Sequence, residues 1–368
     1  MNPRIVIVGA GPIGCYLAQL LKKQGAKPLI IEEHNEVGRP VHCTGLIGHK
    51  VFAEKRPFRL SSRAITNIIN GAVIHYDRQY FSIHRERVAY VIDRERFDKE
   101  LSQGLDILYQ NRFLGLEKSK SGYIVETNQD EISADIVVGA DGANSTLRKI
   151  LNRDANGISH YQGIQLRIKT KPRYKDLVEL YLKAPSFFWV VPEAQDIVRV
   201  GTISENPHKD LVGFLKETKI KGEILERFGG VVAVGICPHT VRENIALVGD
   251  AACQMKPLSY GGIYFGLKAA SILASCIKER RLQEYDSRWK RELVSEIKIG
   301  LKARQFYRRL DKDELSKIFW ILKTQKSLIE KIGDFENHSR LLLEIIKKPR
   351  LYPQIGTLLP MFFKKISD

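Results

Sequence analysis

A glycine-rich turn near the N-terminus has the residue types and spacing needed to bind a phosphate group. Gly9, Gly11 and Gly14 form a G-x-G-x-x-G pattern between the apolar run 5–8 and a helical pattern. The first glycine permits a tight bend, the second lets the backbone approach a pyrophosphate, and the third lets the helix pack on the strand. Free N–H groups at the start of that helix favour an anion. The pattern predicts a dinucleotide site, and Pro12 falls within it.

An acidic residue follows the next strand-like run. Residues 28–31 read as a second buried strand that ends at Glu32, eighteen residues past Gly14. A carboxylate in this place can accept hydrogen bonds from the hydroxyls of a ribose. Glu33 is the neighbouring candidate, but its side chain should face the other way because successive strand residues alternate. These features do not distinguish NAD from FAD.

The pattern of an apolar strand followed by an acidic glycine-containing turn occurs twice more in the sequence. Residues 134–138 lead into Asp141 and Gly142, and residues 244–248 lead into a G-D-A turn at Asp250. The second of these turns is followed by Pro257, by a glycine pair and by a helical run. Acidic residues often end strands in turns, but three such segments together favour one large cofactor.

These motifs resemble those of the FAD-dependent monooxygenase and reductase superfamily with the para-hydroxybenzoate hydroxylase-like fold. The resemblance implies that Asp250 binds the ribityl hydroxyl of FAD and that Gly261 and Gly262 begin a helix facing the flavin. That positive helix end would stabilise an anionic reduced flavin. The resemblance places eight residues at the cofactor: Arg94, Asp141, Gly142, Asp250, Pro257, Gly261, Gly262 and Ile263.

The segment 38–47, G-R-P-V-H-C-T-G-L-I, is similar to a loop of the geranylgeranyl reductase family in which the cysteine lies near the flavin. The resemblance implies that Arg39 and Cys43 lie at the cofactor. Cys43, His42 and Tyr260 are the candidates for the catalytic acid, and the sequence does not rank them. A lone cysteine can also be a small buried apolar residue, so a chemical role for Cys43 stays open.

A second segment, F-F-W-V-V-P at 187–192, is similar to the family's Y-x-W-x-F-P motif, which lines the substrate cavity. We therefore expect Phe187, Trp189 and Pro192 to bind substrate, although an ordinary buried strand has the same pattern. Tyr260 departs from the family, because glycine is common at its position. Its side chain would point to solvent, narrow the flavin edge or supply a proton.

The predicted fold class is α/β. A discontinuous Rossmann-type FAD-binding domain is expected over 1–55, 90–155 and 235–285. An antiparallel β-sheet substrate domain is expected over 56–89 and 156–234, because 164–168 and 198–202 have strand patterns. A helical region is expected over 286–368.

The chain carries 59 Lys and Arg against 42 Asp and Glu, a net charge of +17. Nothing resembles a nucleic-acid module, so we expect no nucleic-acid partner. The five scattered cysteines show no metal-ligand spacing, so we expect reduced thiols and no metal site. No run approaches the roughly 20 apolar residues that span a bilayer. Aromatic residues beside lysines in 347–365 would suit either contact with a membrane surface or a terminal helix docked on the body.

The family resemblance implies an FAD-dependent oxidoreductase that saturates carbon–carbon double bonds of geranylgeranyl chains, in precursors of membrane lipids. An alternative is an FAD-dependent monooxygenase of an aromatic or polyprenyl-quinone substrate, and a second is a non-catalytic flavin-binding or electron-carrier protein. The electron donor would be external: ferredoxin, NAD(P)H or a quinol. We expect a cytoplasmic protein, with peripheral contact on the inner face of the cell membrane through its basic C-terminal region.

Overall fold

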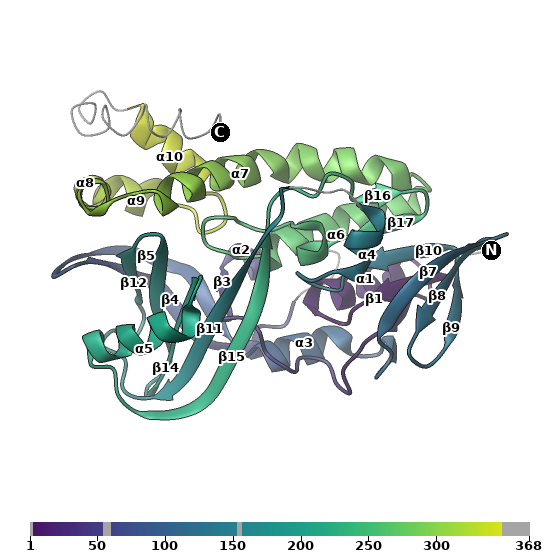
Figure 1. Ribbon diagram of the computed structural model, residues 1–368, viewed down its shortest axis with the longest axis horizontal. Coiled ribbons are helices and arrows are strands. Elements are labelled where there is room, and N and C mark those ends of the chain that lie inside the picture. Colours follow the sequence, from purple (N-terminus) through teal and green to yellow (C-terminus); the bar gives the residue numbers. More distant parts are fainter. Residues whose placement is uncertain (1–2, 54–59, 153–156, 348–368) are drawn as a thin grey trace.

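The computed structural model describes residues 3–53, 60–152 and 157–347. The described chain forms a six-stranded sheet and an eight-stranded sheet. Figure 1 shows the long helix α7 (Tyr285–Arg308) lying above the strands. The first half of α7 packs on helix α6 (Ile263–Lys278) through Trp289 and Leu293. Its last turns pack on the eight-stranded sheet through Phe306 and Tyr307. One helix therefore joins both sheets.

The six-stranded sheet is parallel except at one edge, where β16 pairs antiparallel with β17. Its strands are, in spatial order, β16 (Val241–Arg242), β17 (Ile245–Leu247), β10 (Ile136–Gly139), β1 (Ile5–Val8), β2 (Leu29–Ile31) and β6 (Asp106–Leu108). Both faces are covered, as parallel sheets require. Ile5 and Ile7 face helices α1 (Pro12–Lys23) and α6, while Val6 and Val8 face the opposite side.

That opposite side is covered by a three-stranded antiparallel sheet that the sequence analysis did not predict. It consists of β7 (Phe113–Ser119), β8 (Gly122–Thr127) and β9 (Glu131–Ala134). Tyr123 and Val125 of β8 pack with Leu147 and Leu151 of helix α4 (Thr146–Leu151) against the six-stranded sheet. Helix α3 (Arg94–Ser102) lies on the other side, against α1.

The eight-stranded sheet is antiparallel except where β12 pairs parallel with β4. Its strands are, in spatial order, β15 (Glu223–Val234), β11 (Ser159–Lys169), β14 (Ile197–Ser204), β13 (Ser186–Ala194), β12 (Val178–Lys183), β4 (Ile65–Tyr76), β5 (Gln79–Ile92) and β3 (Leu46–Gly48). Leu166, Phe188 and Val200 on one face pack on Leu211 and Phe214 of helix α5 (Pro207–Thr218). The segments 164–168 and 198–202 thus pair as neighbouring strands.

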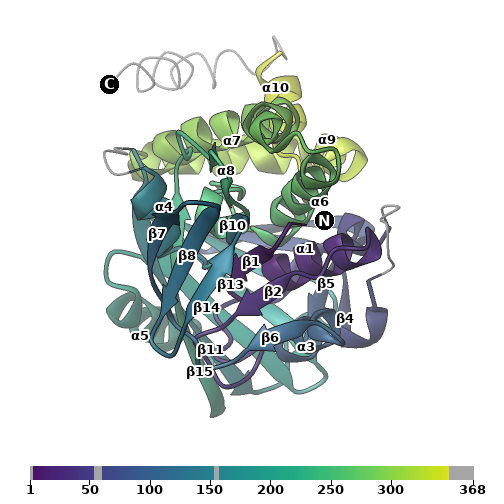
Figure 2. The ribbon, with the colours of Figure 1, turned by 90° about the vertical axis from the view of Figure 1, so that its right-hand side faces the viewer.

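The C-terminal region of the described chain is helical, and Figure 2 shows its helices together on one side of the sheets. After α7 come α8 (Lys312–Thr324), α9 (Lys326–Ile332) and α10 (Ser339–Ile346). In the described ranges no helix has the length and apolar character needed to cross a membrane. The predicted membrane contact concerns 347–365, nearly all of which lies outside the described residues. The architecture confirms the predicted α/β fold with an antiparallel sheet and C-terminal helices.

Candidate active site

The glycine-rich turn joins β1 to α1, and its three glycines are present for different reasons. Gly9 has a φ of +101°, and a Cβ there would lie 2.6 Å from the carbonyl oxygen of Ala140. A Cβ on Gly14 would collide with the carbonyl of Gly9. Gly11, in contrast, has φ −63° and ψ 174°, and a Cβ there would meet no atom within 4 Å. Nothing in the described protein requires glycine at 11, so the residue type fits a ligand that approaches the backbone.

Glu32 lies at the end of β2 and is bound to the glycine-rich turn. Its Oε2 accepts a hydrogen bond from the backbone N–H of Ala10 at 2.7 Å, and its Oε1 accepts one from the N–H of His34 at 3.0 Å. The side chain is largely buried, whereas Glu33 is exposed, as its place in the strand predicts. Of the two acids, Glu32 is therefore the one beside the predicted nucleotide site.

The G-D-A turn forms the 3₁₀ helix η2 (Gly249–Ala252) beneath the N-terminus of α6. A Cβ on Gly262 would collide with Oδ1 of Asp250. Burial raises the pKa of the Asp250 carboxyl, against the opposing charges of Arg94 and Arg148. No hydrogen bond to this carboxylate comes from the described part of the chain. The Asp250 carboxylate is half-buried and lies beside the N-terminus of α6, which no side chain caps. It is therefore suited to bind a ligand hydroxyl.

Asp141 and Gly142 follow β10, where Asp141 stabilises the start of α4. The backbone N–H of Leu147 donates to Oδ2 of Asp141 at 3.3 Å. Burial raises the pKa of this carboxyl, although hydrogen bonds from Ser145 and the backbone oppose the rise. Gly142 has a φ of +72°, in the left-handed region. The structure therefore gives Asp141 a local role in shaping the turn, and its contact with the cofactor stays a prediction.

The two predicted arginines differ in environment. Arg94 is the first residue of α3, and its Nη2 lies 2.9 Å from Oδ2 of the buried Asp98. Burial lowers the pKa of Arg94, but Asp98 and the neighbouring Cys43 outweigh this effect and the pKa is raised. Arg39 is exposed and forms an ion pair with Glu95 at 2.9 Å on the outer surface of α3. Arg94, but not Arg39, is thus a buried cation close to Cys43 and Asp250.

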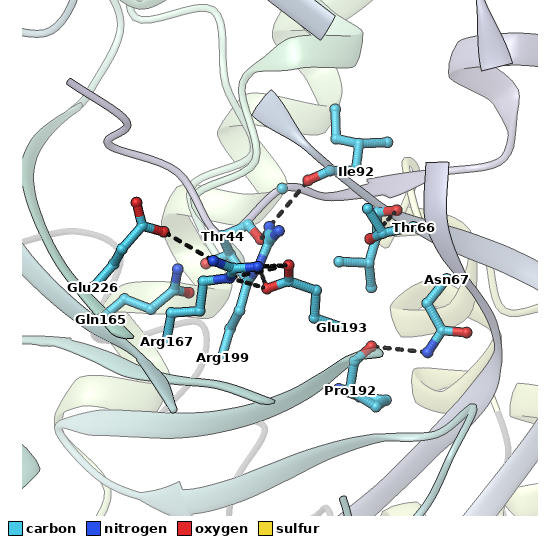
Figure 3. Close-up of polar contacts among 12 residues, drawn as sticks. Thr44, Thr66, Asn67, Ile92, Gln165, Arg167, Pro192, Glu193, Arg199 and Glu226 are labelled. Atoms are coloured by element: carbon cyan, nitrogen blue, oxygen red, sulfur yellow. Dashed lines mark hydrogen bonds and ion pairs between the residues drawn. The ribbon is translucent and has the colours of Figure 1, made fainter. Parts of the chain in front are cut away.

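A buried ionic network supports the loop that carries Cys43 (Figure 3). Nε of Arg199 donates to Oε2 of Glu193 at 2.8 Å, and Arg167 binds the same carboxylate at 2.9 Å. Arg199 also donates to the carbonyl oxygens of Thr44 and, at 3.0 Å, of Ile92. These bonds fix the backbone next to Cys43. Sequence reasoning missed this network, because its members lie on strands that only the folded sheet brings together.

A cavity of about 450 Å³ lies between the second face of the eight-stranded sheet and the α9–α10 region. Its wall is mostly apolar, which suits a hydrocarbon ligand. Phe187 and Trp189 line it as predicted, whereas Pro192 is buried away from it and accepts a hydrogen bond from Asn67. The other apolar side chains of the wall include Leu46, Ile69, Ala72, Ile83, Val88, Ile164, Val178, Leu180, Ile203, Phe228, Val232, Ile329, Phe335 and Leu341.

All three candidate acids line this cavity. Cys43 is half-buried, and its Sγ accepts from the N–H of Gly45 at 3.3 Å. His42 is exposed, and its Nδ1 bonds to the carbonyl of Gly229. Tyr260 has a φ of +59°, and its hydroxyl accepts from Nε and Nη2 of Arg304 at 3.1 and 3.0 Å. The Tyr260 ring also stacks on Phe187, so this side chain is held at the cavity and does not point freely into solvent.

A buried ion pair connects the predicted flavin edge to the C-terminal helices. Nζ of Lys256 lies 2.9 Å from Oε2 of Glu336 and donates to the carbonyl of Phe335 at 2.7 Å. Both charged side chains are almost fully buried. Glu336 in addition accepts from the backbone N–H of Gly48 at 3.0 Å. The segment between α9 and α10 is thereby fixed over the cavity beside Pro257, which follows Lys256.

The residues present fit a flavin dinucleotide. There is open space over Gly11, and no side chain caps the N-termini of α1 and α6, so these places could hold phosphates and a flavin. The free carboxylate of Asp250 could bind a ligand hydroxyl. The cavity adjoins this region through Cys43, Lys256 and Gly261. A ligand in the cavity would therefore lie next to the flavin.

Comparison with known proteins agrees with this assignment. Residues 7–67 match the model of an NAD(P)-binding Rossmann-like domain. An uncharacterised protein of Methanocaldococcus jannaschii is 33% identical over 93% of this chain and 94% of its own length. Digeranylgeranylglycerophospholipid reductases of Methanococcus vannielii and Methanocaldococcus jannaschii are each 26% identical, over 94% and 96% of this chain and 95% and 98% of their own.

Among solved structures, a geranylgeranyl bacteriochlorophyll reductase-like protein from Thermoplasma acidophilum superposes with a TM-score of 0.81 at 23% identity, over 97% of this chain and 99% of its own. The fold and these relatives define the class of the protein, a flavin-dependent oxidoreductase that uses FAD. Within that class, the chain belongs to the geranylgeranyl reductase family.

Proposed function

We propose that this protein reduces carbon–carbon double bonds in the geranylgeranyl chains of a membrane-lipid precursor. The observation that supports this most strongly is the apolar cavity of about 450 Å³, which reaches the predicted flavin edge at Cys43 and Gly261. Cavities of this size hold small organic ligands. The named relatives, digeranylgeranylglycerophospholipid reductases, support the same substrate class.

Bound FAD, once reduced, supplies the hydride for such a reaction. The protein's own residues would do the rest. Phe187, Trp189 and the aliphatic wall exclude water and hold the chain against the flavin. An isolated alkene accepts hydride poorly, so an acid must deliver a proton to its second carbon in the same step. Cys43, His42 and Tyr260 line the cavity and are the candidates for that proton transfer. The electrons would come from an external donor: ferredoxin, NAD(P)H or a quinol.

The product of the reaction tests this function. Holoenzyme kept reduced with dithionite under nitrogen would be incubated with a geranylgeranylated glycerophospholipid, and the recovered lipid analysed by mass spectrometry. We expect the lipid to gain two hydrogens for each double bond reduced. Recovery of unchanged lipid would exclude this substrate. If the lipid instead gains oxygen, and only after air is admitted, the protein is a monooxygenase.

A further inference from the structure

One polar side chain stands out in the apolar wall of the cavity. Gln165 lies in the middle of β11, on the face that lines the cavity, and only 4% of the residue is exposed. Its sheet neighbours are Gly201 of β14 and Phe228 of β15. A polar group is costly in such a place unless it is hydrogen-bonded. The bonds that its amide makes therefore indicate what the cavity accommodates.

The orientation of the Gln165 amide is fixed by Trp189. Nε1 of Trp189 lies 3.0 Å from Oε1 of Gln165. An indole N–H can only donate a hydrogen bond, so the partner must be the oxygen of the amide and not its nitrogen. The NH₂ group of Gln165 consequently points away from Trp189.

That NH₂ group is buried and has no hydrogen-bond partner among the described residues. Figure 3 shows the Gln165 side chain beside Arg167, with no contact drawn from it to the residues of the ionic network. The neighbouring Arg167 cannot accept a hydrogen bond from this NH₂ group, because a guanidinium only donates. Arg167 is itself bound to Glu193 and Glu226. Buried donors in folded proteins nearly always have a partner. The described residues around the cavity leave this donor unpaired, and a ligand in the cavity could satisfy it.

We propose that Gln165 binds substrate by donating a hydrogen bond to an oxygen atom of the isoprenoid. This inference rests on the proposed function and deepens it, because alkene carbons and methyl groups are poor acceptors. A hydrocarbon chain would leave the amide unpaired, whereas an alcohol or ether oxygen at the end of the prenyl chain would satisfy it. Gln165 thus selects oxygen-bearing isoprenoids, with Trp189 orienting its amide for that contact.

Binding to the oxidised holoenzyme tests this selection without requiring turnover. The change in flavin absorbance would be titrated with three ligands of equal chain length: geranylgeraniol, a geranylgeranyl glycerol ether and the corresponding hydrocarbon. Of the alcohol and the ether, we expect the one that binds more tightly to have an affinity about 10- to 100-fold above that of the hydrocarbon. This is the range of affinity that satisfying a buried donor provides. The alcohol and the ether distinguish a free prenyl alcohol from a glycerolipid as the source of the oxygen.

Two variants assign the preference to the amide. Gln165→Met removes both polar atoms and should reduce the preference to less than about 3-fold. Gln165→Leu likewise has no donor or acceptor but differs in shape from methionine, so it should lose the preference as well. Gln162→Met is the matched control, because Gln162 lies on the same strand but is exposed and outside this cavity. Its preference should equal that of the wild type.

Equal binding of all three ligands by the wild-type protein would overturn the inference, as would a preference that survives in both Gln165 variants. Failure of the proposed function gives a different result. If the protein selects oxygenated ligands through Gln165 but never reduces them, the reductase reaction is excluded. The binding role of Gln165 would still be supported.

Discussion

Replacement of Gly11 by valine is expected to abolish FAD binding while the protein still folds. The backbone of Gly11, at φ −63° and ψ 174°, is one that any residue adopts, and a Cβ there meets no protein atom within 4 Å. The added side chain would instead occupy the space into which a pyrophosphate must come. We expect the affinity for FAD to fall at least about 100-fold, because close approach of the backbone to the phosphates is lost.

The measurement is the FAD content of the purified variant, together with its thermal unfolding and a titration with added FAD. Gly213→Val is the matched control, because Gly213 is an exposed glycine of α5 whose Cβ also meets no atom within 4 Å. That variant should bind FAD normally. Full flavin occupancy in Gly11→Val would show that the cofactor does not lie against this turn.

The largest effect on stability is expected from replacement of Arg199 by methionine. The side chains of Arg199 and Glu193 are each only 7% exposed. In the variant, the buried carboxylate of Glu193 keeps only its more exposed partner, Arg167. The carbonyl oxygens of Thr44 and Ile92 lose a donor at the same time. Breaking a buried ion pair by removing one partner costs about 3–5 kcal/mol in the free energy of unfolding.

Arg167→Met is the control on the same carboxylate. Its side chain is 29% exposed, so its loss should cost about 1 kcal/mol. Denaturant unfolding of the two variants, each compared with the wild type, measures the difference. Equal costs would contradict the view that Arg199 is the member of the network that supports the Cys43 loop.

The stabilisation that this ionic network gives to the folded protein depends on pH. Burial acts to raise the pKa of Glu193, but hydrogen bonds from Arg167 and Arg199 outweigh it, so the pKa lies below its usual value. The stabilisation is therefore fully present above the unfolded-state pKa of about 4.3 and is lost as the pH falls through the folded-state value. The difference between wild type and Arg199→Met should shrink in acid for this reason.

The nucleotide half of the site could be predicted from the sequence because its signals are local. A buried strand, a glycine turn and a helix follow one another in the sequence, so Gly9, Gly11, Gly14 and Glu32 could be named as candidates without knowledge of the fold. Asp250 was found in the same way, from a strand followed by an acidic turn. Each of these residues lies in a turn, at the end of a strand or in the first turn of the following helix, and such local structure is determined by neighbouring residues.

The substrate half could be predicted only in part, because pairing of distant strands assembles it. Gln165 meets Trp189 across β14, and Arg199 meets Thr44 from a segment 155 residues away. No spacing in the sequence reveals such contacts. In the alternating pattern I-Q-L-R-I of 164–168, Gln165 occupies a polar position like that of Arg167, so no local signal indicated that its side chain lines a cavity. Lys256 directly precedes the recognised motif that begins at Pro257, but its partner Glu336 comes from the predicted helical region.

The most direct test of the central claim, that the apolar cavity presents an alkene to the reduced flavin, is the rate of flavin reoxidation without oxygen. Reduced holoenzyme would be mixed anaerobically with the geranylgeranylated glycerophospholipid while flavin absorbance is followed. We predict reoxidation by the geranylgeranylated lipid and none by the fully saturated lipid. Flavin that stays reduced with both lipids until oxygen is admitted would contradict the account.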